Sequence, residues 1–214
     1  MQEIIAHRGA SAHAAEHTLA AYDLAVAQGA DVLELDVRET ADGRLVVVHD
    51  ETLLRTAGDP RRVDSVDSAA LAALDPDVRP LTLATVLVRY RRNARFLLDL
   101  KEPAPEWEGR LLATISRTCV RDRVVVQSFD HAALRRLRAA APWLNLAALT
   151  RTRPLDLAAL AAFAHGVGPW HESVDAAFVT AAHANGLAVR PWTVNDPVAI
   201  AHLISLGVDG VITD

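Results

Sequence analysis

Three short polar clusters lie where apolar, strand-like runs of the sequence end: His7-Arg8-Gly9, Glu34-Leu35-Asp36 and His49-Asp50. Imidazole groups titrate near neutral pH, so His7 and His49 are candidates for a general acid and a general base. An arginine stays charged at any working pH and grips a phosphate through two hydrogen bonds, which makes Arg8 a candidate phosphate ligand. Together these residue types indicate phosphate chemistry.

Three carboxylates and a lysine extend this set. Strand residues two apart share a face, so Glu34 and Asp36 project together, and the same spacing relates Asp99 to Lys101. Buried carboxylates repel one another unless a proton or a cation neutralises them. An acidic pair alone is more often structural, but three carboxylates beside two histidines favour a metal site. Their hard oxygen ligands favour Mg²⁺ or Ca²⁺ over zinc. Lys101 either adds charge against the phosphate or neutralises Asp99, and both roles are compatible.

The elements that must position these residues follow an alternating pattern. Apolar runs of four to seven residues alternate with longer Ala/Leu-rich segments of helical period, which is typical of repeated βα units. The pattern predicts strands at 3–6, 32–37, 96–101, 123–127, 145–149, 166–168, 187–192 and 208–213. It predicts helices near 18–28, 82–92, 107–118, 131–140, 155–163, 175–184 and 197–205. We therefore expect an α/β protein, a single (β/α)₈ barrel domain over residues 1–214. Active sites of such barrels form at the carboxyl ends of the strands, where the polar clusters lie.

One segment breaks the alternation. Ala41-Asp42-Gly43 predicts a hairpin turn into an extra short strand at 45–48, just before His49. Residues 51–80 then form a stretch too long for an ordinary βα loop. We expect this insertion to cover the catalytic face, with a plain surface excursion as the alternative. The sequence ends directly after the eighth predicted strand, which predicts a truncated final helix and a less well covered, less stable last seam of the barrel.

Composition excludes several classes of protein. The net charge is −5, and the 22 basic residues are spread along the chain, which opposes nucleic-acid binding. No apolar run approaches the length of a membrane span, and the start of the sequence lacks a leader pattern, so we expect a soluble, cytoplasmic protein with a small-molecule substrate. The single cysteine, Cys119, has apolar neighbours and is expected to be an inert core thiol. The oligomeric state stays open.

The segment HRGASAHAAEHTLAAYDLAVAQGADVLELDVRETADGRLVVVHDETLLRT, which begins at His7, resembles the signature of the glycerophosphodiester phosphodiesterase family. In that family HRG, ENT, ExD, a T-x-DG turn and HD-x-x-L-x-RT follow in this order and spacing. Weaker matches continue through Leu98-Asp99-Leu100-Lys101, Gln127-Ser128-Phe129, Trp192-Thr193-Val194-Asn195 and the closing Gly207-Val208-Asp209-Gly210-Val211-Ile212-Thr213-Asp214. The resemblance therefore spans nearly the whole chain.

The resemblance implies hydrolysis of a glycerophosphodiester to glycerol 3-phosphate and an alcohol on a (β/α)₈ barrel. It implies that His7 and His49 are the acid/base pair and that Arg8 binds the phosphate. The divalent ion would be held by Glu34, Asp36 and Asp99. Trp192 would form a wall of the substrate pocket, although a core tryptophan is an equally good interpretation. Whether the reaction passes through a cyclic phosphate is left open by the sequence.

Two residues depart from the family pattern. Asp99 stands where the family usually has glutamate, and the shorter side chain is expected to shift or weaken the metal site. His17 replaces the asparagine of ENT, between the retained Glu16 and Thr18, and would make an equivalent hydrogen bond only in one tautomer. Two alternatives follow. One is a lysophospholipase D-like enzyme that cleaves lipid phosphodiesters, and the other is a non-catalytic barrel that binds phosphodiesters.

Overall fold

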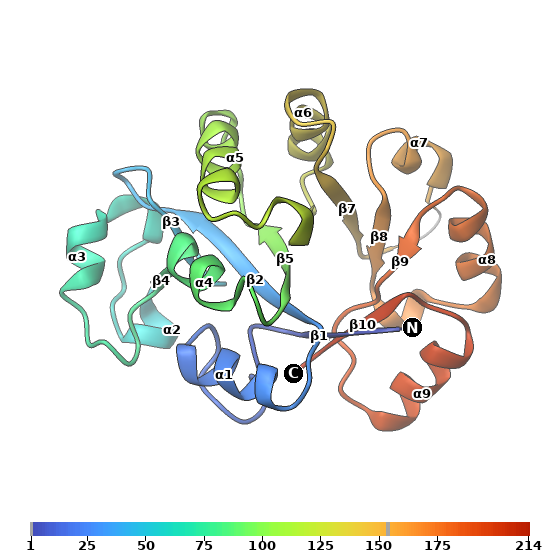
Figure 1. Cartoon of the computed structure of the whole chain (residues 1–214), viewed down its shortest axis with the longest axis horizontal. Coiled ribbons are helices and arrows are strands. Elements are labelled where there is room, and N and C mark those ends of the chain that lie inside the picture. The colour runs from blue at the N-terminus through green and yellow to red at the C-terminus, as the bar shows by residue number, and fades with distance from the viewer. Residues whose placement is uncertain (1, 153–154) are drawn as a thin grey trace.

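The computed structural model describes residues 2–152 and 155–214, and it confirms the predicted (β/α)₈ barrel (Figure 1). Parallel strands follow one another around the wall in the order β10-β1-β2-β5-β6-β7-β8-β9. Backbone hydrogen bonds close the wall between its last and first strands: the Asp209 N–H donates to the Val189 carbonyl, the Ile212 N–H to the Pro191 carbonyl and the Val194 N–H to the Ile212 carbonyl. The strands of the wall are β1 Glu3–Ala6, β2 Val32–Glu39, β5 Arg95–Leu100, β6 Val124–Ser128, β7 Asn145–Thr150, β8 Gly166–Pro169, β9 Ala188–Val189 and β10 Gly210–Thr213.

Helices surround the wall in Figure 1. Most of them begin at a polar capping residue. They are α1 Leu19–Ala27, α4 Leu83–Tyr90, α5 Glu108–Arg117, α6 His131–Ala140, α7 Leu157–Ala161, α8 Ala176–Ala184 and α9 Pro197–Ser205, with short 3₁₀ turns η2 Pro105–Trp107, η3 Arg121–Arg123 and η4 His171–Ser173. The Thr18 hydroxyl and the Asp196 carboxylate, for example, accept hydrogen bonds from the first turns of α1 and α9. Within the described residues, every helix is too short or too polar to cross a bilayer.

The alternation of side chains along the strands creates two apolar regions. Leu33, Leu35 and Val37 of β2 are fully buried in the main core, between the wall and the helices. A smaller cluster of Ile5, Val32, Leu97 and Ile212 packs on its own as a separate apolar group. Val32 is two residues before Glu34 and four before Asp36, so both carboxylates share the face of Val32 and lie further toward the carboxyl end of β2. Glu34 and Asp36 therefore share one face of β2, as the sequence spacing predicts.

The predicted extra strand is present and anchors the insertion. Strand β3 (Leu45–Val47) runs antiparallel to β2 and pairs with the short β4 (Leu81–Thr82). Between β3 and β4 lie α2 (Leu54–Ala57), η1 (Val63–Ser65) and α3 (Ser68–Ala72), which the sequence analysis did not predict. Apolar side chains of β3 and of the segment that follows it form a cluster of their own: Val46, Val48, Leu53, Val63, Val66 and Leu71. The insertion is therefore a folded unit on the edge of β2.

Two sequence predictions need correction. Strand β9 is shorter than the predicted 187–192, because Pro191 has no N–H to donate to the sheet, and Trp192 makes only an isolated bridge to Trp170. Cys119 is exposed instead of buried. It follows the last turn of α5 with a φ of 58°, and this left-handed turn directs its side chain out of the core.

Candidate active site

One cavity opens beyond the carboxyl ends of the strands, and all eight predicted site residues line it: His7, Arg8, Glu34, Asp36, His49, Asp99, Lys101 and Trp192. They come from five separated stretches of the sequence. The barrel brings them together because parallel strands deliver their carboxyl ends to the same edge. The cavity is also lined by residues that the sequence analysis did not assign to the site, namely Gln127, Phe129, Leu149, Arg151, Thr193 and Ile212.

A strained turn shapes the first wall of the cavity. Arg8 has a φ of 60° and Gly9 a φ of 84°, so the chain reverses sharply after β1. A side chain at Gly9 would lie 2.8 Å from the backbone of Ala21, which explains why glycine is needed there. The turn directs the Arg8 N–H to the Glu34 carboxylate at 2.9 Å. The motif His-Arg-Gly thus has a geometric as well as a chemical reason.

His7 is oriented by a carboxylate from the other end of the sequence. Its Nδ1 lies 2.5 Å from Asp214 Oδ1, and Ser11 and Asn195 also donate hydrogen bonds to Asp214. The hydrogen bond from His7 lowers the pKa of Asp214 to about 2, so this carboxylate is ionised and only accepts. Nδ1 of His7 therefore carries a proton, and Nε2 remains available to the cavity. Sequence reasoning missed Asp214, although it directly follows the last strand and closes the quoted terminal motif.

His49 is held in the same manner by its neighbour. Its Nδ1 lies 2.7 Å from Asp50 Oδ1, and the guanidinium of Arg55 donates to Asp50 Oδ2 at 2.7 Å. The hydrogen bond from Arg55 lowers the pKa of Asp50 to about 2, so His49 Nδ1 is again the donor. Burial lowers the pKa of His49 itself, which keeps its Nε2 unprotonated near neutral pH.

Arg55 gives the insertion a role at the site. Besides Asp50 it binds both oxygens of Glu16 at 2.7 Å, and Glu16 also pairs with Arg8. The insertion therefore fixes the support of His49. Of the described cavity-lining residues, none comes from 51–80, so a cover over bound substrate stays a prediction.

The acidic centre is almost completely buried. Glu34, Asp36 and Asp99 expose between 1% and 5% of their surface. Burial, together with the neighbouring carboxylates, raises the pKa of Glu34 well above its ordinary value, and burial raises the pKa of Asp99 to about 6. Burial would also raise the pKa of Asp36, but hydrogen bonding to His17 and the nearby cations outweigh it and lower that pKa. Lys101 Nζ bridges Asp36 and Asp99 at 3.0 and 2.5 Å.

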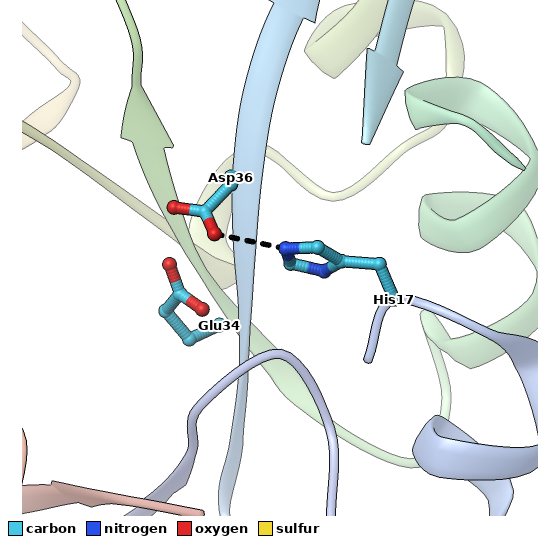
Figure 2. Close-up of side chains that lie close together, drawn as sticks. All are labelled: His17, Glu34 and Asp36. Atoms are coloured by element: carbon cyan, nitrogen blue, oxygen red, sulfur yellow. Dashed lines mark hydrogen bonds and ion pairs between the residues drawn. The ribbon is translucent and has the colours of Figure 1, made fainter. Parts of the chain in front are cut away.

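This centre fits a divalent cation. Oδ1 of Asp99 is buried and lacks a hydrogen-bond partner among the described residues, and two of the three carboxylates hold protons more tightly than usual. The cluster is therefore short of positive charge. The atoms of metal-ligand type that converge within 4.8 Å belong to His17, Glu34 and Asp36, and Figure 2 shows these three side chains around β2. Asp99 lies outside this set.

His17 is thus closer to the centre than the sequence analysis assigned it. Its Nε2 lies 2.9 Å from Asp36 Oδ2 and its Nδ1 2.7 Å from the Tyr22 hydroxyl. Because Asp36 accepts, Nε2 carries the proton and Nδ1 accepts from Tyr22, which is the single tautomer that the sequence analysis required. His17 has a φ of 59°, a conformation that asparagine and histidine tolerate better than most residues.

Trp192 and Arg8 are held in place by contacts of different kinds. The Trp192 indole N–H donates to the Gly168 carbonyl at 2.7 Å, which fixes the ring beside Phe129 at a centroid distance of 5.5 Å. Arg8 Nε lies 3.1 Å from Asp36 Oδ2. One side of the cavity is therefore charged, and the side that carries Trp192 is aromatic.

Comparisons with known proteins identify relatives of the whole chain. Residues 7–214 match the model of the glycerophosphoryl diester phosphodiesterase family. The glycerophosphodiester phosphodiesterase of Caldanaerobacter subterraneus subsp. tengcongensis is 32% identical, over 99% of this chain and 93% of its own length. The crystal structure of the glycerophosphodiester phosphodiesterase from Agrobacterium tumefaciens superposes with a TM-score of 0.86 at 27% identity, covering 100% of this chain and 96% of that one.

A third structure contains a ligand. The phosphodiesterase OLEI02445 of Oleispira antarctica, solved in complex with the product sn-glycerol-3-phosphate, superposes with a TM-score of 0.86 at 26% identity over 100% of this chain and 93% of that one. The fold and the site define a hydrolase of the phosphodiesterase class. The chain belongs to the glycerophosphoryl diester phosphodiesterase family.

Proposed function

We propose that this protein hydrolyses glycerophosphodiesters to glycerol 3-phosphate and an alcohol, with Mg²⁺ or Ca²⁺ bound at the acidic centre. The observation that carries the proposal is the pair of histidines in one cavity, each with its Nδ1 held by an ionised aspartate, beside buried carboxylates that are short of positive charge. The product found in the Oleispira antarctica relative supports the same reaction.

The two histidines divide the proton transfers between them. His49 is unprotonated at neutral pH because burial lowers its pKa, so it accepts the proton of the attacking hydroxyl. His7 donates a proton from Nε2 to the leaving oxygen, and the Asp214 carboxylate accepts the Nδ1–H and so orients the ring for this step. After one turnover, the proton taken by His49 and the proton lost by His7 are exchanged with solvent. Acid and base therefore act from different walls of the cavity.

The phosphate is bound by the cations of the charged side. Arg8 offers a guanidinium fixed by Glu16 and Asp36, and Lys101 offers an ammonium fixed between Asp36 and Asp99. Because both cations are positioned before substrate arrives, little reorganisation is needed as negative charge develops on the phosphoryl oxygens. Glu34, Asp36 and Asp99 would hold the divalent ion, with His17 supporting Asp36. When bound, this ion supplies Lewis-acid polarisation of the phosphoryl group.

The assignment of acid and base is tested with leaving groups of different basicity. His7→Ala should lower kcat on glycerophosphoethanolamine by about 10²–10⁴, as expected for loss of a general acid. The loss should be much smaller on a p-nitrophenyl phosphodiester, because p-nitrophenolate leaves without protonation. His49→Ala should be impaired on both substrates. Equal losses for His7→Ala on both substrates would contradict the assignment.

Lipid substrates and a non-catalytic role are the competing proposals. The rim of the cavity carries one strongly exposed aromatic, Phe129, and the insertion is rich in ion pairs such as Arg62 with Asp64, which favours water-soluble substrates. Turnover of glycerophosphocholine and of a lysophospholipid, measured side by side, distinguishes a hydrolase of glycerophosphodiesters from a lysophospholipase D-like enzyme. Metal binding without any turnover would favour the binding role. The cytoplasmic location stays a prediction.

A further inference from the structure

The aromatic side of the cavity carries a cation that the proposed mechanism does not use. Arg151 follows the last residue of β7, and it lines the same cavity as His7 and Arg8. In the closed order of the wall, β7 lies four strands from β1 in either direction, so Arg151 enters the mouth from the side opposite His7 and Arg8. It therefore faces the phosphate-binding cations across the cavity.

Two rings hold the Arg151 side chain in this position. Its guanidinium carbon lies 4.8 Å from the ring centre of Phe129 and 5.4 Å from that of Trp192. These two rings meet edge to face at 5.5 Å, and the Trp192 indole is itself fixed by its hydrogen bond to Gly168. Stacking on aromatic faces attracts a guanidinium but satisfies none of its five N–H donors. The rings therefore place the cation without occupying its hydrogen-bonding edge.

Arg151 differs from the other cations of the cavity in its partners. Arg8 pairs with Glu16 and Asp36, and Lys101 pairs with Asp36 and Asp99. For Arg151, no carboxylate partner occurs within residues 2–152 and 155–214. Among the described residues, no negative charge therefore neutralises Arg151 on this side of the cavity. A guanidinium without a carboxylate partner is suited to bind a carboxylate or a phosphate of a ligand.

We propose that Arg151, with Phe129 and Trp192, forms a subsite for an anionic group on the alcohol part of the substrate. This inference rests on the proposed function, since the scissile phosphate is taken to bind at Arg8 and Lys101. An arm of the diester that crosses the cavity then reaches Arg151. Alcohols with a carboxylate or a second phosphate gain a charge-assisted hydrogen bond there. Alcohols with a quaternary ammonium group bind less well there, because the guanidinium already covers the aromatic faces and repels a second cation.

Glycerophosphoserine and glycerophosphoethanolamine provide a matched test, because they differ by one carboxylate. A hydrogen bond to a charged group contributes about 1.5–3 kcal/mol, so kcat/KM of the wild-type enzyme should favour glycerophosphoserine by about tenfold or more. Arg151→Gln, which keeps a planar group over the rings, should reduce this ratio to near one. Arg121→Gln is the control, because Arg121 stacks over Trp143 at 4.0 Å outside the cavity. It should keep the wild-type ratio.

Equilibrium binding separates the subsite from catalysis. Wild type and Arg151→Gln are titrated calorimetrically in EDTA with the same two diesters, so that turnover does not enter. Tighter binding of glycerophosphoserine to wild type, with this preference lost in Arg151→Gln, supports the subsite. If neither diester is then hydrolysed when metal is restored, that result overturns only the proposed function. Equal binding of both diesters to wild type, no binding of either, or an unchanged preference in Arg151→Gln overturns the subsite.

Discussion

Replacing Asp214 with asparagine tests the support of His7 with little change in shape. The new amide side chain would still form hydrogen bonds with Ser11 and with Asn195, but it would offer the His7 ring either a neutral oxygen or an N–H. The ionised acceptor that fixes the proton on Nδ1 would be lost. Without that acceptor the His7 ring is held less firmly, so its Nε2 is no longer fixed toward the leaving oxygen. We therefore expect slower protonation of the leaving group.

The size of the effect follows from the geometry. The hydrogen bond between His7 Nδ1 and Asp214 Oδ1 is short and charged, and the two side chains are 19% and 28% exposed. A hydrogen bond to a charged group contributes about 1.5–3 kcal/mol, which corresponds to about 10–100-fold in rate. Because both side chains are partly exposed, we expect a smaller loss in rate than for a fully buried catalytic dyad. Asp214→Asn should thus lower kcat by about 10–100-fold, less than His7→Ala, with a small change in KM.

The assay is steady-state hydrolysis of glycerophosphoethanolamine at pH 7 to 8, with circular dichroism to verify folding. Asp209→Asn is the matched control, because Asp209 accepts from His183 at 2.9 Å and lies before β10, at the end of the strand remote from the cavity. It should leave kcat near the wild-type value, even if it lowers Tm. A folded Asp214→Asn enzyme with wild-type kcat, or one as slow as His7→Ala, would refute the reasoning.

Three further predictions concern the supports of the acidic centre and of His49. The pKa of Asp99 is raised to about 6, so its contribution to stability is present below about pH 4 and is lost as pH rises through 6. In differential scanning calorimetry without metal, Asp99→Asn should therefore have a Tm a few degrees above that of wild type at pH 7 but not at pH 4. A variant whose Tm equals that of wild type at pH 7 as well as at pH 4 would contradict this. His17→Ala removes the hydrogen bond to Asp36 and should weaken Mg²⁺ or Ca²⁺ binding by about 10–100-fold in calorimetric titration, whereas His17→Asn should lose less. Arg55→Gln frees Asp50 and should lower kcat by about tenfold, in line with loss of a charged hydrogen bond, while an unchanged kcat would remove Arg55 from the support of His49.

The barrel could be predicted because strands and helices leave different periods in the sequence. The Leu33-Leu35-Val37 face and the Glu34-Asp36 face of β2 alternate as the sequence indicates. Helix α6, at His131–Ala140, has the predicted bounds, since Asp130 caps its first turn. The helices of the insertion were not predictable from period, because a four- or five-residue helix is too short to show one. They are held by tertiary packing around Leu53 and Val63.

The site could be predicted only where strand ends mark it. Rules of strand parity and barrel position brought together His7, Glu34, Asp36, His49 and Asp99 without any tertiary information. The supporting residues escaped for a physical reason, which is that their partners are remote in sequence. Asp214 is 207 residues from His7, and Arg55 is 39 residues from Glu16. A carboxylate or a guanidinium shows its role only when the fold brings its partner within hydrogen-bonding distance.

The most direct test of the central claim is ³¹P nuclear magnetic resonance of glycerophosphoethanolamine hydrolysis by EDTA-treated enzyme, before and after Mg²⁺ or Ca²⁺ is added back. We predict no turnover in EDTA, recovery with a divalent ion, and glycerol 3-phosphate as the phosphorus-containing product. The same sample of His49→Ala should stay inactive after metal is restored. Full turnover in EDTA, or release of phosphoethanolamine instead of glycerol 3-phosphate, would contradict the account.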